Sequence, residues 1–250
     1  MAIFPQLLIG HPPQRAGLAG AAPVPQDQLI PINGIFGDQN GWQKQAADWG
    51  NANTPFAWTS CFHLEGLMKW GQASHADALA QVIIAARQAA HGGRVSVISH
   101  SNGAQLTRMA LQRNPAARLD DAFLLGAADY CDCNKNGWNA LLKAGQVQRV
   151  FMGVSEGDHI LQWNFLTPSF WGCTLGRDGP KNVPLGIFDA SFFALPTTDV
   201  AGPVIVGQEN GYDHGDWVWS GDGTISDAVR AILQIPPRAT VKDSLTVGVT

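Results

Sequence analysis

Short apolar runs rich in β-branched residues recur along this chain and alternate with stretches of helical periodicity. Such runs are typical of strands that are buried on both faces of a sheet. They cover residues 29–33, 55–63, 94–98, 121–125, 147–154 and 203–207. Strands separated by helices in this way predict an α/β fold with a mostly parallel sheet of about six or more strands and helices on both faces.

Apolar residues at helical spacing predict the helices between these strands. The clearest helix follows the capping box Ser74–Asp77, and its apolar stripe consists of Leu79, Val82, Ile83, Ala86 and Ala90. Further helices are predicted at residues 43–49, 104–114 and 138–144. The last helix begins at a second capping box, Thr224–Asp227, and ends before Pro236.

The whole chain, residues 1–250, is predicted to form a single domain, because it contains no internal repeat and no low-complexity linker. The longest irregular segment lies after the strand at residues 147–154. We interpret residues 159–200 as a cap-like or lid-like insertion, since long loops inside a domain usually cover a binding site. Residues 236–250 form a C-terminal tail whose role the pattern does not indicate.

Charge and hydropathy exclude several classes of partner. The net charge is −4 and the 16 lysines and arginines are scattered, so we expect no nucleic-acid partner. No apolar run approaches the length of a transmembrane helix, and no signal peptide is visible. The compartment is unknown, with the cytoplasm slightly favoured, and the oligomeric state is not indicated.

The cysteine pattern does not indicate a metal centre. The four cysteines are Cys61, Cys131, Cys133 and Cys173, and no second pair at zinc-ligand spacing accompanies Cys131 and Cys133. We expect free thiols or one ordinary disulfide. Asp213 and Asp216, close to a histidine, are interpreted as solvated loop carboxylates, so neither a metal nor a cofactor is expected.

A sharp turn of small residues, Ser99–Gly103, connects the strand at 94–98 with the helix at 104–114. In such a turn a serine is raised above the strand end, and the helix N-terminus points its free N–H groups toward it. Ser101 is therefore a candidate nucleophile, with a helix-capping serine as the alternative. His100 is interpreted as a structural neighbour, because adjacent side chains in a tight turn point apart.

Asp158 and His214 follow later strands, and the ends of parallel strands gather at one edge of a sheet. A histidine can remove a proton from a serine, and a carboxylate can orient that histidine. For the carboxylate, Glu156 and Asp129 compete with Asp158. For the histidine, His63 and His159 compete with His214.

The turn around Ser101, the segment Glu156–Ile160 and the histidine before the last helix together resemble the α/β-hydrolase superfamily over residues 28–235. The resemblance implies Ser101 as nucleophile, Asp158 as acid and His214 as base. It also implies an oxyanion hole formed by the backbone N–H of Asn102 and by Ile35 or Phe36. Ser99 stands where the family's G-x-S-x-G motif has its first glycine.

Aromatic residues concentrate between residues 163 and 193. They form either a cap whose aromatic wall binds an apolar substrate or a subdomain that packs them into the core. The candidate substrate-binding residues are Trp163, Phe165, Phe170 and Trp171.

These features predict a carboxylic ester hydrolase, similar to carboxylesterases and lipases, that acts on a small-molecule or lipid-like ester through an acyl-enzyme. Thioesterase, peptidase and acyltransferase activities use the same residues and stay open. The alternative from another class is a non-catalytic domain that binds a hydrophobic ligand or partner.

Overall fold

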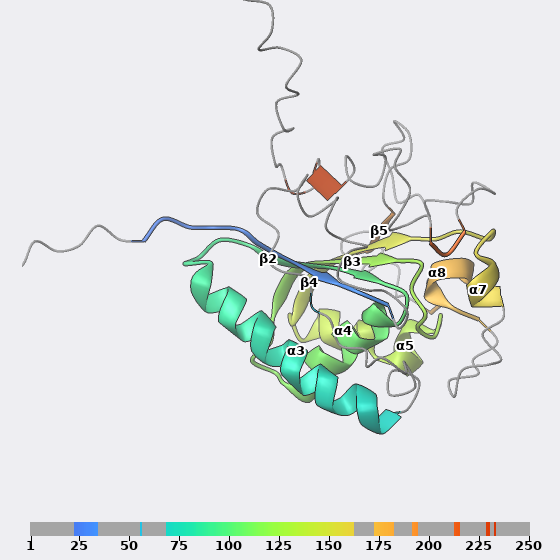
Figure 1. Cartoon of the computed structure of the whole chain (residues 1–250), viewed down its shortest axis with the longest axis horizontal. Helices are drawn as coiled ribbons and strands as arrows, with labels where there is room; N and C mark the ends of the chain where they lie inside the picture. The colour runs from blue at the N-terminus through green and yellow to red at the C-terminus, as the bar shows by residue number, and fades with distance from the viewer. Residues whose placement is uncertain are drawn as a thin grey trace, which may run out of the picture.

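The computed structural model describes residues 23–34, 56, 69–162, 173–182, 192–194, 213–215, 229–230 and 233. They form an α/β structure around one parallel sheet in the order β1-β2-β3-β4-β5 (Figure 1). Its strands are β1 (Gln28–Ile32), β2 (Val95–His100), β3 (Leu119–Leu125), β4 (Val147–Gly153) and β5 (Phe192–Ala194). The predicted parallel sheet is confirmed. A sheet of six or more strands is not, because only five strands lie in the described part.

One face of the sheet carries the main apolar core. The parallel register aligns Ile30, Val97, Ala122 and Val150 in one row across the first four strands. This row packs with buried residues of α3 (Lys69–Ala89), α4 (Asn102–Arg113) and α6 (Trp138–Lys143). Figure 1 shows α3 and α4 together on this side of the sheet. Burial of these apolar side chains is the main force that holds the helices against the strands.

The opposite face carries a second row of buried side chains, which includes Ile98, Phe123 and Phe151. The rings of Phe123 and Phe151 stack with centroids 4.9 Å apart. Val229 and Leu233, which fall in the predicted last helix, are helical and buried. Helices on both faces stay a prediction, since most residues of that helix lie outside the described part.

The predicted start of the long helix is wrong. α3 begins at Lys69, so the capping box at Ser74 lies inside the helix. Gln72 gives the physical reason: it is buried, and its side-chain amide donates a hydrogen bond to Oε1 of Gln105 in α4. Tertiary packing against α4 therefore extends the helix to the N-terminal side of a local start signal.

The segment interpreted as a cap contains regular elements that the sequence did not predict: α7 (His159–Gln162), α8 (Leu175–Asp178) and β5. A cap over residues 159–200 stays a prediction, because much of this range lies outside the described residues, as do the predicted strand 203–207, the helix 43–49 and the tail 236–250. The short helix α5 (Cys133–Asn136) is capped by the side chain of Asp132. No helix among the described residues is long and apolar enough to cross a membrane.

Candidate active site

The carboxyl ends of β1 and β2 form the point where the chain changes direction across the sheet. Phe56 makes a parallel bridge with Ile32 on one side of β1 and donates its N–H to Pro31 at 2.8 Å. The chain then returns to form β2 on the other side of β1. Ligands of open parallel sheets bind at such switch points, beyond the strand ends.

Ser101 lies directly after β2 in a strained backbone conformation, with φ 55° and ψ −128°. A non-glycine residue in such a region costs about 1–3 kcal/mol and persists only where its surroundings hold it. Here the Ser101 N–H donates to Leu125, and its carbonyl accepts from Ala104 and Ala128, each at 3.1 Å. The last residue of β3 and the loop after it thus hold both backbone groups of Ser101. The Ser101 side chain makes no capping hydrogen bond to α4, which disfavours the helix-capping alternative.

Two glycines let the backbone approach this turn closely. A Cβ at Gly34 would lie 2.7 Å from Cβ of Ser101, and a Cβ at Gly103 would lie 2.8 Å from the carbonyl oxygen of Asn33. Position 99 does not need a glycine: Ser99 has no positive φ, and its buried hydroxyl donates to the carbonyl of Phe123 at 3.1 Å. The departure from the family motif is therefore accommodated by the neighbouring strand.

The structure brings Ser101, His214 and Asp158 into one line of hydrogen bonds. Nε2 of His214 lies 2.8 Å from Oγ of Ser101, and Nδ1 of His214 lies 2.7 Å from Oδ2 of Asp158. Asp158 is fully buried, and Ser101 is 9% exposed. Ser101 follows β2 and Asp158 follows β4, and His214 is 113 positions from the first and 56 from the second in the sequence.

The partners of His214 determine which ring nitrogen carries the proton. An ionised carboxylate only accepts hydrogen bonds, so Nδ1 of His214 donates to Asp158 and Nε2 accepts from the Ser101 hydroxyl. The other oxygen of Asp158, Oδ1, accepts the Leu161 N–H at 2.9 Å, which fixes the carboxylate at the start of α7. An imidazole held in this way can take the serine proton and become stabilised by the carboxylate.

The competing carboxylates are placed differently. Asp129 is fully buried, but it pairs with Arg108 through Oδ2–Nε at 2.7 Å and Oδ1–Nη2 at 3.0 Å. The indole N–H of Trp138 donates to the same carboxylate at 3.1 Å. Glu156 is exposed. Asp158, and neither of these, is hydrogen-bonded to His214.

His159, one of the two competing histidines, does not occupy the place of His214. The His159 side chain is exposed, and its backbone N–H donates to Oδ1 of Asp213 at 3.3 Å. The same oxygen accepts the backbone N–H of His214 at 2.7 Å, so Asp213 connects the His214 loop with α7. His63 lies outside the described residues, as does Asp216.

His100 has a contact that sequence reasoning missed. Its Nε2 donates to the main-chain carbonyl of His214 at 2.7 Å, and the two imidazole centroids are 4.7 Å apart. Burial is the main reason that the pKa of His100 falls to about 3, and the charge of His214 lowers it further. His100 is therefore neutral throughout the physiological pH range.

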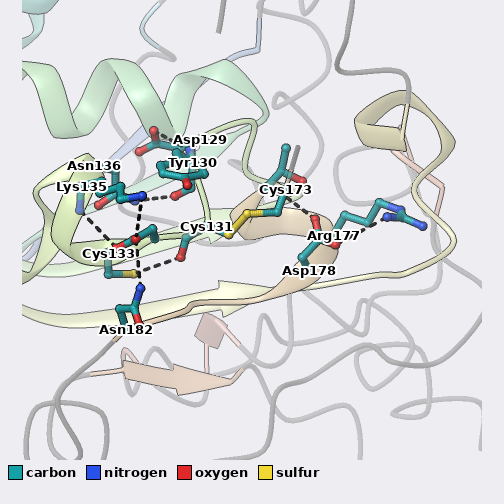
Figure 2. The surroundings of a disulfide bond; sticks show 12 residues. Asp129, Tyr130, Cys131, Cys133, Lys135, Asn136, Cys173, Arg177, Asp178 and Asn182 are labelled. Carbon is teal, nitrogen blue, oxygen red and sulfur yellow. Dashed lines mark hydrogen bonds and ion pairs between the residues drawn. A yellow bond between two sulfur atoms is a disulfide. The ribbon is translucent and has the colours of Figure 1, made fainter. Parts of the chain in front are cut away.

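A disulfide fastens a segment that contacts the surroundings of both Ser101 and Asp158. Cys131, after β3, is bonded to Cys173, which leads into α8 (Figure 2). In this segment the Gly176 N–H donates to the carbonyl of Ala127 at 2.9 Å, and Ala127 is adjacent to Ala128, which bonds to Ser101. The Gly176 carbonyl accepts the N–H of Ser155 at 2.9 Å. The expectation of one ordinary disulfide is met within the described residues. Cys133 is a buried free thiol, and burial raises its pKa to about 12.

The remaining predicted site residues are described only in part. Asn102 is the first residue of α4, and the first N–H groups of a helix have no intrahelical partner. Ile35 and Phe36 lie outside the described residues, as do Trp163, Phe165, Phe170 and Trp171. Among the described residues no group of three or more His, Cys, Asp or Glu side chains could hold a metal ion.

No protein-family model matches the chain, and no curated protein matches its sequence. Among solved structures, it is similar to the RedJ thioesterase of prodiginine biosynthesis from Streptomyces coelicolor, at 20% identity and TM-score 0.31, over 44% of this chain and 47% of that one. It thus spans about half the length of RedJ. Similarity also extends to a cutinase-like protein from Cryptococcus sp., at 15% identity and TM-score 0.39, over 85% and 97% of the two chains.

A lipase-esterase related protein from Clostridium acetobutylicum is similar at 10% identity and TM-score 0.38, over 82% of this chain and 93% of that one. The names of the three proteins are those of hydrolases or relatives of hydrolases. At these TM-scores we base no assignment of activity on them.

Proposed function

We propose that this chain is a serine hydrolase that cleaves carboxylic esters through an acyl-enzyme on Ser101. The supporting observation is the continuous hydrogen-bonded line from Ser101 Oγ through His214 to the buried Asp158. It ends at a serine in a strained turn between a strand and a helix, the context in which a serine becomes a nucleophile.

In the first half-reaction, Ser101 Oγ attacks the ester carbonyl carbon while His214 Nε2 takes the hydroxyl proton. The tetrahedral intermediate then breaks its bond to the alcohol oxygen, which receives that proton from His214. The acyl group stays on Ser101. Asp158 keeps Nδ1 protonated and stabilises the imidazolium ion in between.

In the second half-reaction, a water molecule takes the place of the alcohol. His214 Nε2 removes a proton from the water as its oxygen attacks the acyl carbon, and the same proton returns to Ser101 Oγ when the acid leaves. The balance is one ester and one water in, one carboxylic acid and one alcohol out. No redox cofactor enters either step.

Negative charge on the substrate oxygen is stabilised by an oxyanion hole in this proposal. One donor is the backbone N–H of Asn102 at the start of α4, where the helix dipole also favours an anion. The second is the N–H of Ile35 or Phe36, which follow Gly34. Gly34 lies against the Ser101 side chain, so the chain leading to these residues passes the reacting centre. Each such donor is worth about 3–4 kcal/mol in the transition state.

The substrate in this proposal is apolar, and Trp163, Phe165, Phe170 and Trp171 line its binding site. These residues follow α7 and precede Cys173, so they connect two segments that lie beside the acid and beside the disulfide. Thioesters, amides and acyl transfer to another alcohol are compatible with the same triad and are separated by experiment.

Hydrolysis of p-nitrophenyl esters from acetate to palmitate by the wild type, Ser101→Ala, His214→Ala and Ser99→Ala tests the proposal. We expect the first two variants to lower kcat by about 10⁴- to 10⁶-fold. Ser99→Ala is the matched control, because Ser99 lies two residues away but bonds to the sheet, and it should keep most activity. No hydrolysis of any chain length by the wild type would favour a non-catalytic binding domain. A parallel thioester series separates esterase from thioesterase.

A further inference from the structure

The loop that carries His214 is fastened to the strand that carries the nucleophile. The imidazole Nε2 of His100 donates to the main-chain carbonyl of His214 at 2.7 Å. His100 is the last residue of β2 and directly precedes Ser101. A partly buried hydrogen bond between residues 114 positions apart therefore couples the two partners of the proton transfer.

The chemistry of this contact fixes the state of His100. A carbonyl oxygen only accepts hydrogen bonds, so Nε2 of His100 must carry a proton. The side chain is 6% exposed and remains neutral at working pH, because burial holds its pKa at about 3. His100 is thus a permanent donor that does not change while the neighbouring His214 gains and loses its proton.

Two hydrogen bonds of the His214 loop, both to the Asp213 side chain, are weaker supports. Within residues 213–215, the His214 N–H bonds to the side chain of Asp213, an adjacent and exposed residue. Asp213 also accepts from His159 at 3.3 Å. The His214 side chain itself bonds to Ser101 and Asp158, but those bonds change during the reaction. The His100 bond, by contrast, is partly buried and reaches the main chain of this loop from the end of β2.

We propose that His100 is a positioning residue, whose hydrogen bond to the His214 carbonyl keeps the imidazole in line with Ser101 Oγ. The inference rests on the proposed function and deepens it. It predicts a specific kinetic effect, because a displaced base slows proton transfer while substrate binding stays unchanged. Loss of this bond therefore lowers kcat and the rate of Ser101 phosphonylation and leaves KM unchanged.

Three substitutions separate the hydrogen bond from the volume of the side chain. His100→Gln retains a side-chain N–H donor that reaches about as far as Nε2. His100→Leu is similarly bulky but has no donor. His100→Asn has a donor that ends one bond short, and it serves in place of His100→Leu if that variant does not fold.

The experiment measures kcat and KM on p-nitrophenyl butyrate and the second-order rate of labelling by a fluorophosphonate. Labelling to completion counts the competent active sites, so each kcat refers to folded protein. We expect His100→Leu and His100→Asn to lose about 10- to 100-fold in kcat and in labelling rate, with KM within about two-fold. His100→Gln should stay within about three-fold of the wild type.

Either of two results overturns the proposal: His100→Leu with wild-type kcat per active site, or His100→Gln as impaired as His100→Leu. A purely structural role would lower the unfolding midpoint and the number of active sites while kcat per site stays constant. The labelling of the wild type separates the two proposals. A wild type that is never labelled contradicts the serine hydrolase, whereas a labelled wild type with equally labelled variants contradicts only the role of His100.

Discussion

The loops that follow β3 and β4 each contain one fully buried aspartate, and the two carboxylates have opposite kinds of partner. Asp129, after β3, accepts from the guanidinium of Arg108, the indole of Trp138 and the backbone N–H of Tyr130. Asp158, after β4, accepts from one backbone N–H and from the imidazole of His214.

The difference shows that the same residue type has two kinds of partner at the ends of neighbouring strands. Arg108 is permanently charged, so the ion pair at Asp129 is a fixed element of the structure. His214 can gain and lose a proton, and its other nitrogen lies 2.8 Å from a serine hydroxyl. Burial therefore does not distinguish the candidate acid Asp158 from Asp129. The difference is that the partner of Asp158 is a histidine, which can gain and lose a proton.

The largest expected effect separates the two carboxylates by activity. Asp158→Asn should lower kcat/KM for an ester by about 10³- to 10⁴-fold, because an amide no longer holds the imidazole in the required tautomer. Asp129→Asn is the matched substitution and should stay within about ten-fold per folded molecule. Steady-state kinetics normalised by active-site titration measures both. Equal losses in the two variants would remove the functional distinction between the loops.

The second prediction concerns stability, where we expect the substitution at Asp129 to have a large effect. Asp129→Asn leaves the buried Arg108 without a charged partner, which we expect to cost about 3–5 kcal/mol in the free energy of unfolding. Urea denaturation measures it. Asp77→Asn is the control: Asp77 also pairs with an α4 arginine, Arg113, with two contacts of 2.7 Å. Both of these side chains are exposed, so its loss should change stability far less. Similar losses for both would contradict the account.

The third prediction tests how far the loop after β3 supports the site. The disulfide joins cysteines that are 42 positions apart in the sequence. Removing it with Cys131→Ser and Cys173→Ser frees this loop in the unfolded chain and should destabilise the protein by about 4 kcal/mol. Activity should also fall, because the segment from Cys173 to Gly176 connects the loop near Ser101 with the turn before Asp158. Cys133→Ser is the control, since Cys133 is in no disulfide. Thermal unfolding with and without a reductant provides the measurement, and an unchanged midpoint on reduction would refute this prediction.

The smallest predicted effect extends the comparison to the two histidines. Burial lowers the pKa of His100 from 6.5 to about 3. Between these values the unfolded chain binds a proton that the folded chain does not, so His100 lowers the stability as the pH falls from about 6.5 toward 3. The loss reaches up to about 1.4 kcal/mol per pH unit. His100→Gln should remove this part of the acid sensitivity in urea denaturation at pH 7.5, 6 and 5. Parallel stability profiles for wild type and variant would contradict it.

The sequence pattern predicted the parts of the fold that depend on local order. The observed ends of β1, β2, β3 and β4 lie within two residues of the predicted ones, because continuous apolar runs are local signals. The turn at Ser101 was found in the same way, from a strand, small residues and a helix. Asp158 and His214 were proposed because the carboxyl ends of parallel strands meet at one edge, and the structure brings both side chains into hydrogen-bonded contact with each other.

Other contacts between distant segments could not be predicted. The capping box at Ser74 is a valid local signal that the packing of Gln72 on α4 overrides. The choice of Cys173 as the partner of Cys131 depends on how residues 173–182 return to the loop after β3. The role of His100 depends on a contact across 114 positions, and nothing in its immediate neighbours indicates it.

The central claim is that Ser101 is a nucleophile activated by His214 and Asp158. Incubation with a fluorophosphonate, followed by intact-mass analysis and peptide mapping, tests it most directly. The account predicts one adduct per chain, located on Ser101, absent from Ser101→Ala and strongly slowed in His214→Ala. A wild-type chain without an adduct, or an equal adduct on Ser101→Ala, would contradict it.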